Sequence, residues 1–275
     1  MSAKWGDLAV RTGSAAVLIP AVLLCIWLGG IWFQLFTLLL GYLIAHEWAR
    51  IVHPGHQLQR LLHVGAAVAG TLAPNVFSIP VVFLLVIVLA ATSSFIAWRK
   101  DAAASHWNHL GIFYVGFPVM ALNVLRSDSE FGALAIFWIC LIVWSADTLA
   151  YFSGRMIGGP KLAPLISPKK TWAGFAGAIA GSAIASAGFA YFAQLESIIM
   201  LILLAGALAI VEQGGDLFES ALKRSFNVKD AGQLIPGHGG VIDRVDGLVA
   251  VLVAAVLIGF FRQNGEYAAQ GLLIW

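Results

Sequence analysis

The chain is short of charged residues. Asp, Glu, Lys and Arg make up 11% of its 275 residues, whereas hydrophobic residues make up 60%. This balance is typical of proteins that cross a membrane several times, not of a soluble core with amphipathic or alternating patterns. The net charge of +2 gives no argument for nucleic acid as a partner, because that binding depends on a strongly basic surface.

Cysteine is scarce, and a cleavable leader is not indicated. Cys25 and Cys140 both lie in apolar segments. They have neither a disulfide framework nor metal-ligand spacing, so we expect buried free thiols. Residues 1–28 have a basic start and an apolar run, but no A-x-A cleavage site follows. A retained first helix is therefore expected.

Apolar stretches of nearly bilayer length recur along the chain, which predicts an all-α polytopic membrane helix bundle. We find no repeat, low-complexity tract or soluble domain, so residues 1–275 are expected to form a single membrane domain. Hydrophobic helices fill residues 1–130, and the unusual polar placements fall in residues 140–250. About nine spans are predicted, at residues 14–29, 31–46, 61–75, 78–97, 107–125, 131–152, 172–192, 197–215 and 245–262.

The basic residues predict an orientation. A cytoplasmic N-terminus puts fourteen Lys and Arg residues on the cytoplasmic side and only Arg126 and Arg262 on the other, which follows the positive-inside rule. The fourteen are Lys4, Arg11, Arg50, Arg60, Arg99, Lys100, Arg155, Lys161, Lys169, Lys170, Lys223, Arg224, Lys229 and Arg244.

Residues 216–246 hold an unusual density of charge. The other 244 residues carry only 21 of the chain's 30 charges. Each charged side chain costs roughly 2.5–3.5 kcal/mol at the centre of a bilayer helix, so this segment must meet water, a polar cavity or a charged ligand. Its nine charged residues are Asp216, Glu219, Lys223, Arg224, Lys229, Asp230, Asp243, Arg244 and Asp246.

The spacing in this segment indicates a site for a metal and phosphates. If the stretch from Asp216 is helical, then Asp216, Ser220 and the Lys223-Arg224 pair share one face. Asp243 and Asp246 are one helical turn apart, and two like charges so placed favour a cation between them. Hard oxygen ligands beside phosphate favour Mg²⁺.

A glycine-rich turn and three cations complete this segment. The turn Pro236-Gly237-His238-Gly239-Gly240 allows a ligand to approach the backbone closely. Lys223, Arg224 and Arg244 supply positive charge for phosphate oxygens.

Two further groups of polar residues precede this segment in the sequence. Asp147 lies near the end of an apolar span and is either functional or a structural partner of Arg155 or of a neighbouring helix. In the SPKKTW motif, Lys169, Lys170 and Thr171 stand where the next helix begins, where unpaired N–H groups attract anions. The alternative is ordinary positive-inside anchoring. The motif is not a P-loop, because the required glycines are absent.

Two histidine motifs are less informative. His46-Glu47 begins like a zincin helix, but Arg50 stands where the second His must be. No zinc site is therefore expected there. His238 either contacts phosphate, transfers a proton or simply holds the turn.

These motifs, in this order, resemble the phosphatidate cytidylyltransferase (CDP-diacylglycerol synthase) family. The family signature runs S-x-x-K-R, K-D, a proline-glycine turn, H-G-G and D-R-x-D, and upstream D-T-x-A-Y and S-P-x-K-T-W. In this chain the upstream motifs fall at residues 147–151 and 167–172. The signature reads Ser220-Ala221-Leu222-Lys223-Arg224, Lys229-Asp230, Pro236-Gly237-His238-Gly239-Gly240 and Asp243-Arg244-Val245-Asp246.

The resemblance implies an enzyme that joins CTP and phosphatidic acid to give CDP-diacylglycerol and pyrophosphate. It implies dependence on Mg²⁺, K⁺ as an option for a second metal, a homodimer, and a place in the cell (inner) membrane with the active site facing the cytoplasm. The metal ligands expected are Asp216, Asp243 and Asp246. Catalytic residues expected are Lys170, Ser220, Lys223, Arg224, Asp230, His238 and Arg244, and substrate-binding residues are Asp147, Ser167, Lys169, Thr171, Lys229, Gly239 and Gly240.

Other readings stay open at this point. A CTP-dependent lipid-alcohol kinase would transfer the γ-phosphate of CTP, and a closer variant would act on an isoprenoid phospholipid. From a different class, an ion-coupled transporter would use the carboxylates as an ion pathway. Transporters tend to bind near the bilayer midplane between repeated halves, whereas these polar groups gather at one face.

Overall fold

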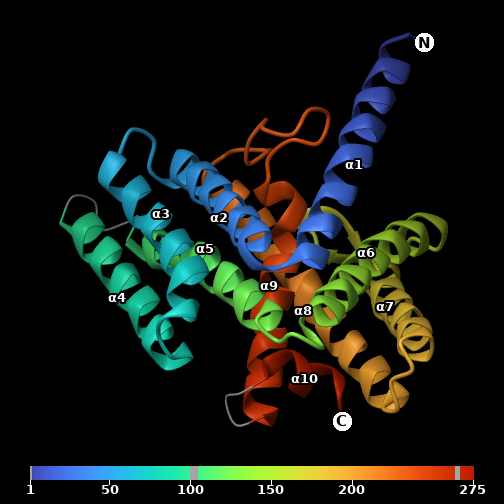
Figure 1. Cartoon of the computed structure of the whole chain (residues 1–275). Coiled ribbons are helices and arrows are strands. Elements are labelled where there is room, and N and C mark those ends of the chain that lie inside the picture. Colours follow the sequence, from blue (N-terminus) through green and yellow to red (C-terminus); the bar gives the residue numbers. More distant parts are fainter. Residues whose placement is uncertain (1, 100–104, 264–266) are drawn as a thin grey trace. The chain divides into compact units, whose positions relative to one another are not determined.

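A computed structural model describes residues 2–99, 105–263 and 267–275 (Figure 1), with side chains from Thr12 onward. Lys4, Arg11 and Lys100, which count toward the predicted orientation, lie outside the described side chains. The described chain is almost entirely helical. Its elements are α1 (Ser2–Leu28), α2 (Gly30–Val52), α3 (Gln57–Leu72), η1 (Ala73–Asn75), α4 (Ile79–Trp98), α5 (Ser105–Arg126), α6 (Gly132–Met156), β1 (Lys161–Ala163), β2 (Ser167–Thr171), α7 (Trp172–Phe192), α8 (Ile198–Ser225), α9 (Ile242–Arg262) and α10 (Ala268–Leu273).

Seven helices in the described part are long and apolar enough to cross a bilayer, namely α2 and α4 to α9. Many of their large apolar side chains are exposed, as helices facing lipid require. The predicted all-α membrane fold is therefore confirmed, and the chain is an integral membrane protein. The first and third expected spans fall on α1, whose apolar part is Thr12–Leu28, and on the 16-residue α3. The count of nine and the orientation of the N-terminus stay predictions.

The chain divides into two compact units. The first comprises residues 1–123 and 226–245, and the second comprises residues 124–225 and 246–275. Helix α9 begins in the first unit and continues in the second. The expectation of a single membrane domain stays a prediction.

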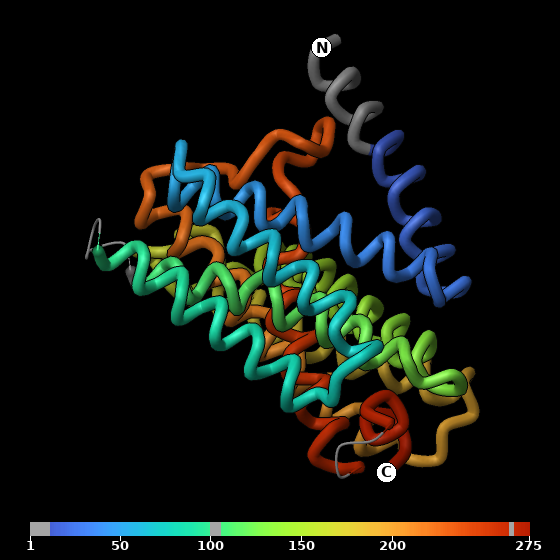
Figure 2. The backbone as a smooth tube through the Cα atoms, turned by 60° about the vertical axis from the view of Figure 1, so that its left-hand side comes forward, coloured from blue at the N-terminus to red at the C-terminus, as the bar shows by residue number. Residues whose placement is uncertain are grey.

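In the first unit, α2, α3 and α4 run alongside one another (Figure 2), with α3 packed against both neighbours. Small residues permit close packing here. A side chain at Gly41 would meet the Cβ of Ala67 at 2.8 Å. A buried hydrogen bond joins two of its helices, because Asn123 on α5 donates from Nδ2 to the hydroxyl of Thr37 on α2 at 3.1 Å.

In the second unit, α7 packs tightly between α6 and α8. A Cβ at Gly177 would collide with the hydroxyl of Ser153, and one at Gly181 would lie 2.7 Å from the Cβ of Leu149. The G-x-x-x-G motif therefore serves close helix packing. Ser186 adds a polar link, accepting from Trp138 Nε1 and donating to a carbonyl of α8, both at 2.9 Å.

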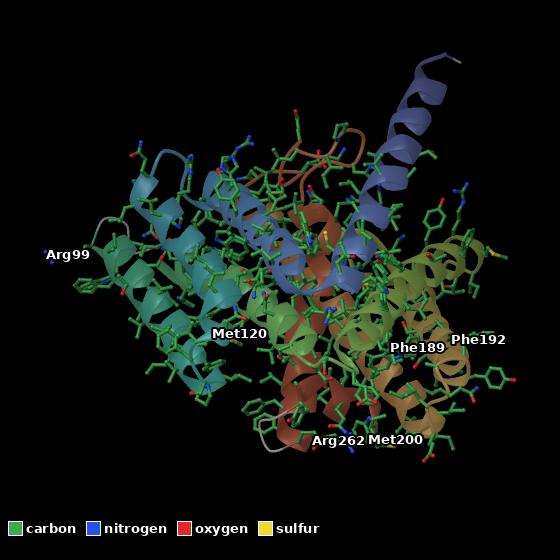
Figure 3. The ribbon with its side chains drawn as sticks, viewed as in Figure 1. Arg99, Met120, Phe189, Phe192, Met200 and Arg262 are labelled. Carbon is green, nitrogen blue, oxygen red and sulfur yellow. The ribbon has the colours of Figure 1, made fainter. Side chains whose placement is uncertain are left out.

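The C-terminal end of the second unit is anchored by Arg262, labelled in Figure 3. Its Nη1 donates to the carbonyls of Gly271 and Ile274, each at 2.6 Å, and its guanidinium lies 3.6 Å from the ring centroid of Trp275. Both cysteines are free thiols, Cys140 buried and Cys25 half-buried.

Candidate active site

Two glycines bring the backbones of α8 and α9 together in the second unit. A Cβ at Gly215 would lie 2.8 Å from the carbonyl oxygen of Asp246, and one at Gly247 would lie 2.7 Å from Oε1 of Glu212. A larger residue at Gly215 would press against the backbone of α9, and one at Gly247 would press against the buried side chain of Glu212. The close crossing places Asp216, which follows Gly215, beside Asp246, which precedes Gly247.

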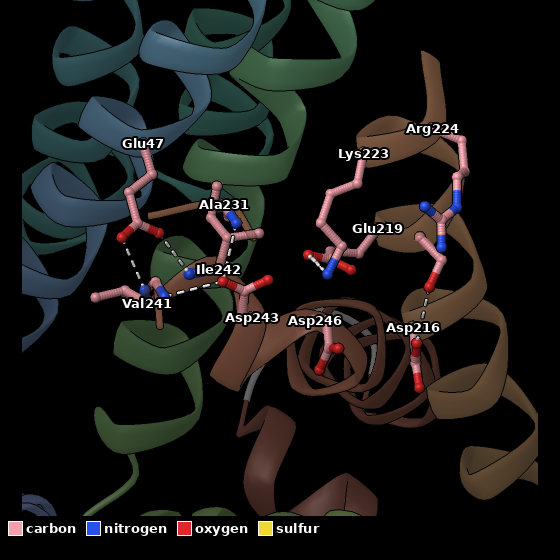
Figure 4. A network of polar contacts seen from close by, with 12 residues as sticks. Glu47, Asp216, Glu219, Lys223, Arg224, Ala231, Val241, Ile242, Asp243 and Asp246 are labelled. Atoms are coloured by element: carbon pink, nitrogen blue, oxygen red, sulfur yellow. Dashed lines mark hydrogen bonds and ion pairs between the residues drawn. The ribbon is translucent and has the colours of Figure 1, made fainter. Parts of the chain in front are cut away.

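Three carboxylates meet at this crossing. Asp216 and Glu219 on α8 and Asp246 on α9 each offer an oxygen, and these oxygens all lie within 4.8 Å of one another (Figure 4). We call this group the carboxylate triad. Among the described residues, it is the one group of three or more His, Cys, Asp or Glu side chains close enough to hold a metal ion.

The triad suits a small hard cation. Oxygens around octahedral Mg²⁺ with bonds of about 2.1 Å are about 3.0 Å apart when adjacent and about 4.2 Å when opposite. A spread of 4.8 Å therefore needs only small side-chain rotations to reach one ion. Three ionised carboxylates this close also repel one another unless positive charge lies among them.

Two lysines offset part of that charge. Lys170 on β2 reaches Asp216, with Nζ 2.6 Å from Oδ2, and Lys223 lies 2.8 Å from Oε1 of Glu219, one turn away on α8. Glu219 is 1% exposed, so its charge is held almost wholly inside the protein. Two cations against three carboxylates leave one negative charge in excess.

A chain of buried polar groups fixes the position of Lys170. Its Nζ donates to Oε1 of Gln213 at 3.0 Å, and Nε2 of Gln213 donates to Oε2 of Glu212 at 2.8 Å. Glu212 and Gln213 are both buried. The lysine is therefore held on one side by a carboxylate of the triad and on the other by an amide.

The strand that carries Lys170 leads directly into α7. β1 and β2 form an antiparallel pair, with Lys161 opposite Thr171. Thr171 is the N-cap of α7, and its hydroxyl accepts from the N–H of Gly174 at 3.1 Å. The helix entrance expected at SPKKTW is thus present, and Thr171 has a structural role in it.

Two other predicted residues lie on the same stretch of α8 as the triad. The hydroxyl of Ser220 lies 3.4 Å from Oδ1 of Asp216, a long contact. Arg224 is exposed, and its Nε reaches the carbonyl of Ile166 at 3.4 Å. The helical face predicted for this segment is thus present, because Asp216, Ser220 and Lys223 all come from α8.

The glycine-rich turn belongs to the first unit and is bonded to the other predicted metal ligand, Asp243, in the first turn of α9. Oδ2 of Asp243 accepts from the N–H groups of Ala231 and Gly240, both at 2.9 Å (Figure 4). Its metal role stays a prediction, since this oxygen has a structural task already. Gly237 and Gly239 have φ of +74° and +85°, which favours glycine. Nδ1 of His238 lies 2.9 Å from the hydroxyl of Ser14.

The roles of the remaining predicted residues stay predictions. Asp147 is exposed on α6, and its charge interacts with those of Glu212 and Asp246. The guanidinium of Arg155, two turns further along α6, donates to the hydroxyl of Tyr151 at 2.6 Å. Ser167 is half-buried on β2. The exposed ones are Lys169, Lys229, Asp230 and Arg244.

Sequence reasoning missed several residues that the structure places at or near these groups. Glu219 is one turn from Asp216, the spacing that already pointed to Asp243 and Asp246, so the same signal was available. Glu212 and Gln213 sit in an apolar span, where polar and ionisable side chains are functional candidates by default. Glu47 appeared only as part of a failed zinc motif, although the structure buries it completely.

Comparison with known proteins agrees with the signature. The model of a family described as "Cytidylyltransferase family" matches residues 9–261. A phosphatidate cytidylyltransferase of Brucella abortus is 38% identical over 92% of this chain and 93% of its own length. One of Bacillus subtilis is 42% identical over 52% of this chain and 54% of its own, and one of Rickettsia typhi is 36% identical over 64% and 80%. This chain therefore belongs to the cytidylyltransferase family.

Proposed function

We propose that the protein is a phosphatidate cytidylyltransferase, a membrane nucleotidyltransferase that joins CTP and phosphatidic acid into CDP-diacylglycerol and releases pyrophosphate. The observation that carries the proposal is the carboxylate triad beside Lys170, inside the region matched by the family. Relatives named for this activity over more than nine-tenths of the chain support the choice of substrates.

Asp216, Glu219 and Asp246 are the residues that would hold Mg²⁺, with Asp243 as a further candidate and K⁺ as an option for a second ion. The excess negative charge and the hard oxygen donors fit such a cation. When bound, Mg²⁺ supplies neutralisation of charge on the phosphates of CTP.

The reaction is a direct displacement at phosphorus. An oxygen of the phosphatidate phosphate forms a bond to the α-phosphorus of CTP, and the bond from that phosphorus to the bridging oxygen breaks. Pyrophosphate leaves with the electron pair. The attacking phosphate is already ionised near neutral pH, so no general base is required. Positioning and electrostatic stabilisation can supply most of the rate in such transfers.

The cationic side chains of the protein have two different roles in this proposal. Lys170 and Lys223 already neutralise carboxylates of the triad and stand ready to share that charge with phosphate oxygens. Arg224 and Arg244 are exposed and suit bidentate binding of phosphate. The polar chain through Gln213 keeps Lys170 in place while the substrates exchange.

The setting follows from the substrates. Phosphatidate stays in the bilayer, whereas CTP is a polyanion of the cytosol, so we place the site at the cytoplasmic edge of the inner membrane. The distribution of Lys and Arg supports this orientation. A homodimer is proposed from the family resemblance, and crosslinking in native membranes would test it.

The activity can be tested with the purified protein in detergent. It should convert phosphatidate and α-labelled CTP into a labelled lipid in the presence of Mg²⁺, while γ-labelled CTP yields labelled pyrophosphate and no labelled lipid. Asp246→Asn should abolish turnover in a protein that still folds, and Glu196→Gln, which changes an exposed carboxylate between α7 and α8, should have no effect.

Each rival function predicts a different outcome. A lipid-alcohol kinase would label its lipid from γ-labelled CTP and release CDP. An enzyme for isoprenoid phospholipids would prefer such a lipid over diacyl phosphatidate in direct competition. A transporter would consume no CTP in detergent, where no gradient exists. Any of these results would contradict the proposal.

A further inference from the structure

Glu47 is a buried carboxylate with an unusual pair of partners. It lies on α2, is 0% exposed, and accepts from the N–H groups of Val241 and Ile242 at 2.9 and 2.8 Å (Figure 4). A buried charge is costly unless it is hydrogen-bonded. The first N–H groups of a helix are unpaired and carry partial positive charge, so the start of α9 satisfies that need.

Two glycines leave room for this carboxylate. A Cβ at Gly240 would lie 2.7 Å from Oε2 of Glu47, and a Cβ at Gly232 would collide with Oε1. The second glycine of the H-G-G motif, Gly240, is therefore needed for packing within the protein, whether or not a ligand approaches it. Both glycines leave the space that the side chain of Glu47 fills, although Glu47 lies almost two hundred residues earlier in the sequence.

The same turn is held at its other side by Asp243. That carboxylate accepts from the N–H groups of Ala231 and Gly240. Between these points, Ile235 and Gly239 exchange two backbone hydrogen bonds at 2.9 and 3.2 Å. Residues 231–242, which we call the signature turn, are thus organised around two carboxylates and four backbone N–H groups.

We propose that Glu47 is a positioning residue for the reaction. It sets the signature turn and the first residue of α9, and Asp246 follows Ile242 by one helical turn on the same helix. Glu47 acts through these groups and touches no reacting atom. This inference rests on the proposed function, because it gives the turn a task in cytidylyl transfer.

The first test is Glu47→Gln. Glutamine keeps the volume but offers one oxygen, and its NH₂ group would face a backbone N–H that needs an acceptor. Displacement of a reactive group by about 1 Å can cost about 100-fold in rate. We expect kcat to fall by about 100-fold in a monodisperse protein. Hydrogen exchange should become faster in the signature turn.

Asp128→Asn is the matched control. Asp128, just before α6, is also a buried carboxylate bonded to backbone N–H groups. Its Oδ1 accepts from Glu130 at 3.0 Å and Phe131 at 2.8 Å, and its Oδ2 accepts from Gln270 at 3.3 Å. Its loss should lower the thermal unfolding temperature by an amount similar to Glu47→Gln. It should leave kcat within about threefold and exchange in the signature turn unchanged, which separates positioning from general stability.

A second variant covers failure of Glu47→Gln to fold. Gly232→Ala introduces a methyl group against the same carboxylate, and should reproduce the loss of kcat and the faster exchange. Adding Glu47→Asp, which withdraws the carboxylate by one methylene, should restore part of the activity of Gly232→Ala.

Two results would overturn the inference. One is wild-type kcat in folded Glu47→Gln or Gly232→Ala protein, and the other is an equal loss of kcat in Asp128→Asn. A wild-type protein that makes no CDP-lipid would instead contradict the proposed function, so the two failures are distinguishable.

Discussion

The crossing of α8 and α9 offers a sharp prediction, because two adjacent glycines there differ in their surroundings. An added methyl group at Gly215 would lie 2.8 Å from the carbonyl oxygen of Asp246 and 2.9 Å from the Cβ of Ala250. At Gly214 it would meet nothing within 4 Å. Gly214→Ala and Gly215→Ala therefore make the same chemical change, one in open space and one at the crossing.

The magnitudes follow from two opposing effects. Replacing glycine by alanine inside a helix stabilises it by about 0.5–1 kcal/mol. Normal contact between nonbonded carbons is about 3.5–4.0 Å, so the 2.9 Å contact with the Cβ of Ala250 requires Gly215→Ala to push the helices apart by roughly 0.6–1.1 Å. Such overpacking costs about 1–3 kcal/mol. We expect Gly214→Ala to be slightly more stable than wild type and Gly215→Ala to be less stable than Gly214→Ala by about that cost.

The functional effect should be larger than the effect on stability. Separating α8 from α9 moves Asp216 away from Asp246, and a shift of about 1 Å can lower turnover by about 100-fold. Thermal unfolding in detergent and formation of CDP-lipid at saturating substrates would measure the two effects. Equal stability and equal turnover in the two variants would refute the claim that close contact of α8 and α9 at Gly215 brings Asp216 and Asp246 together.

Three further predictions concern the residues around the site and the first unit. Thr171→Ala removes the hydroxyl that caps α7 and should cost about 0.5–2 kcal/mol, whereas Thr171→Ser should keep most of the stability; equal unfolding temperatures would contradict the cap. Lys170→Met should lower turnover by about 10²–10³-fold while the protein stays folded. Lys170→Arg should keep only part of the activity, since the planar guanidinium does not fit the site where one ammonium contacts both Asp216 and Gln213. Full activity of either variant would contradict a role of Lys170 in turnover. Burial and the imidazoles of His63 and His56 lower the pKa of His53 from 6.5 to about 4. The unfolded chain therefore takes up a proton first as the pH falls, so stability is full above pH 6.5 and declines toward pH 4. Thermal unfolding of His53→Gln should show a weaker decline, and an unchanged pH dependence would count against this.

The membrane fold was predictable because apolar length alone reveals a spanning helix. The seven candidate spans of the described chain each fall on a predicted span. The exact boundaries were less accessible. Glu47 and Asp216 lie just beyond their predicted spans, in helices that continue past the apolar stretch, since a helix can extend into a polar region at no cost to its backbone bonds.

The site was only partly predictable, because the spacing of residues along the sequence shows which side chains are neighbours on one helix but not which residues of two different helices meet. Asp216 and Asp246 were both expected as ligands, and the structure brings them together through Gly215 and Gly247. The tasks of Asp243 and Glu47 depend on backbone N–H groups of a turn, which carry no side-chain signature. No pattern in the sequence connects Glu47 with that turn.

Binding of Mn²⁺ in place of Mg²⁺, followed by electron paramagnetic resonance on the purified protein, tests the central claim most directly. Asp216, Glu219 and Asp246 should together create a Mn²⁺ site whose affinity collapses in Glu219→Gln and in Asp246→Asn. Glu196→Gln should bind as wild type does. Unchanged Mn²⁺ affinity in both triad variants would contradict a metal centre at the α8–α9 crossing.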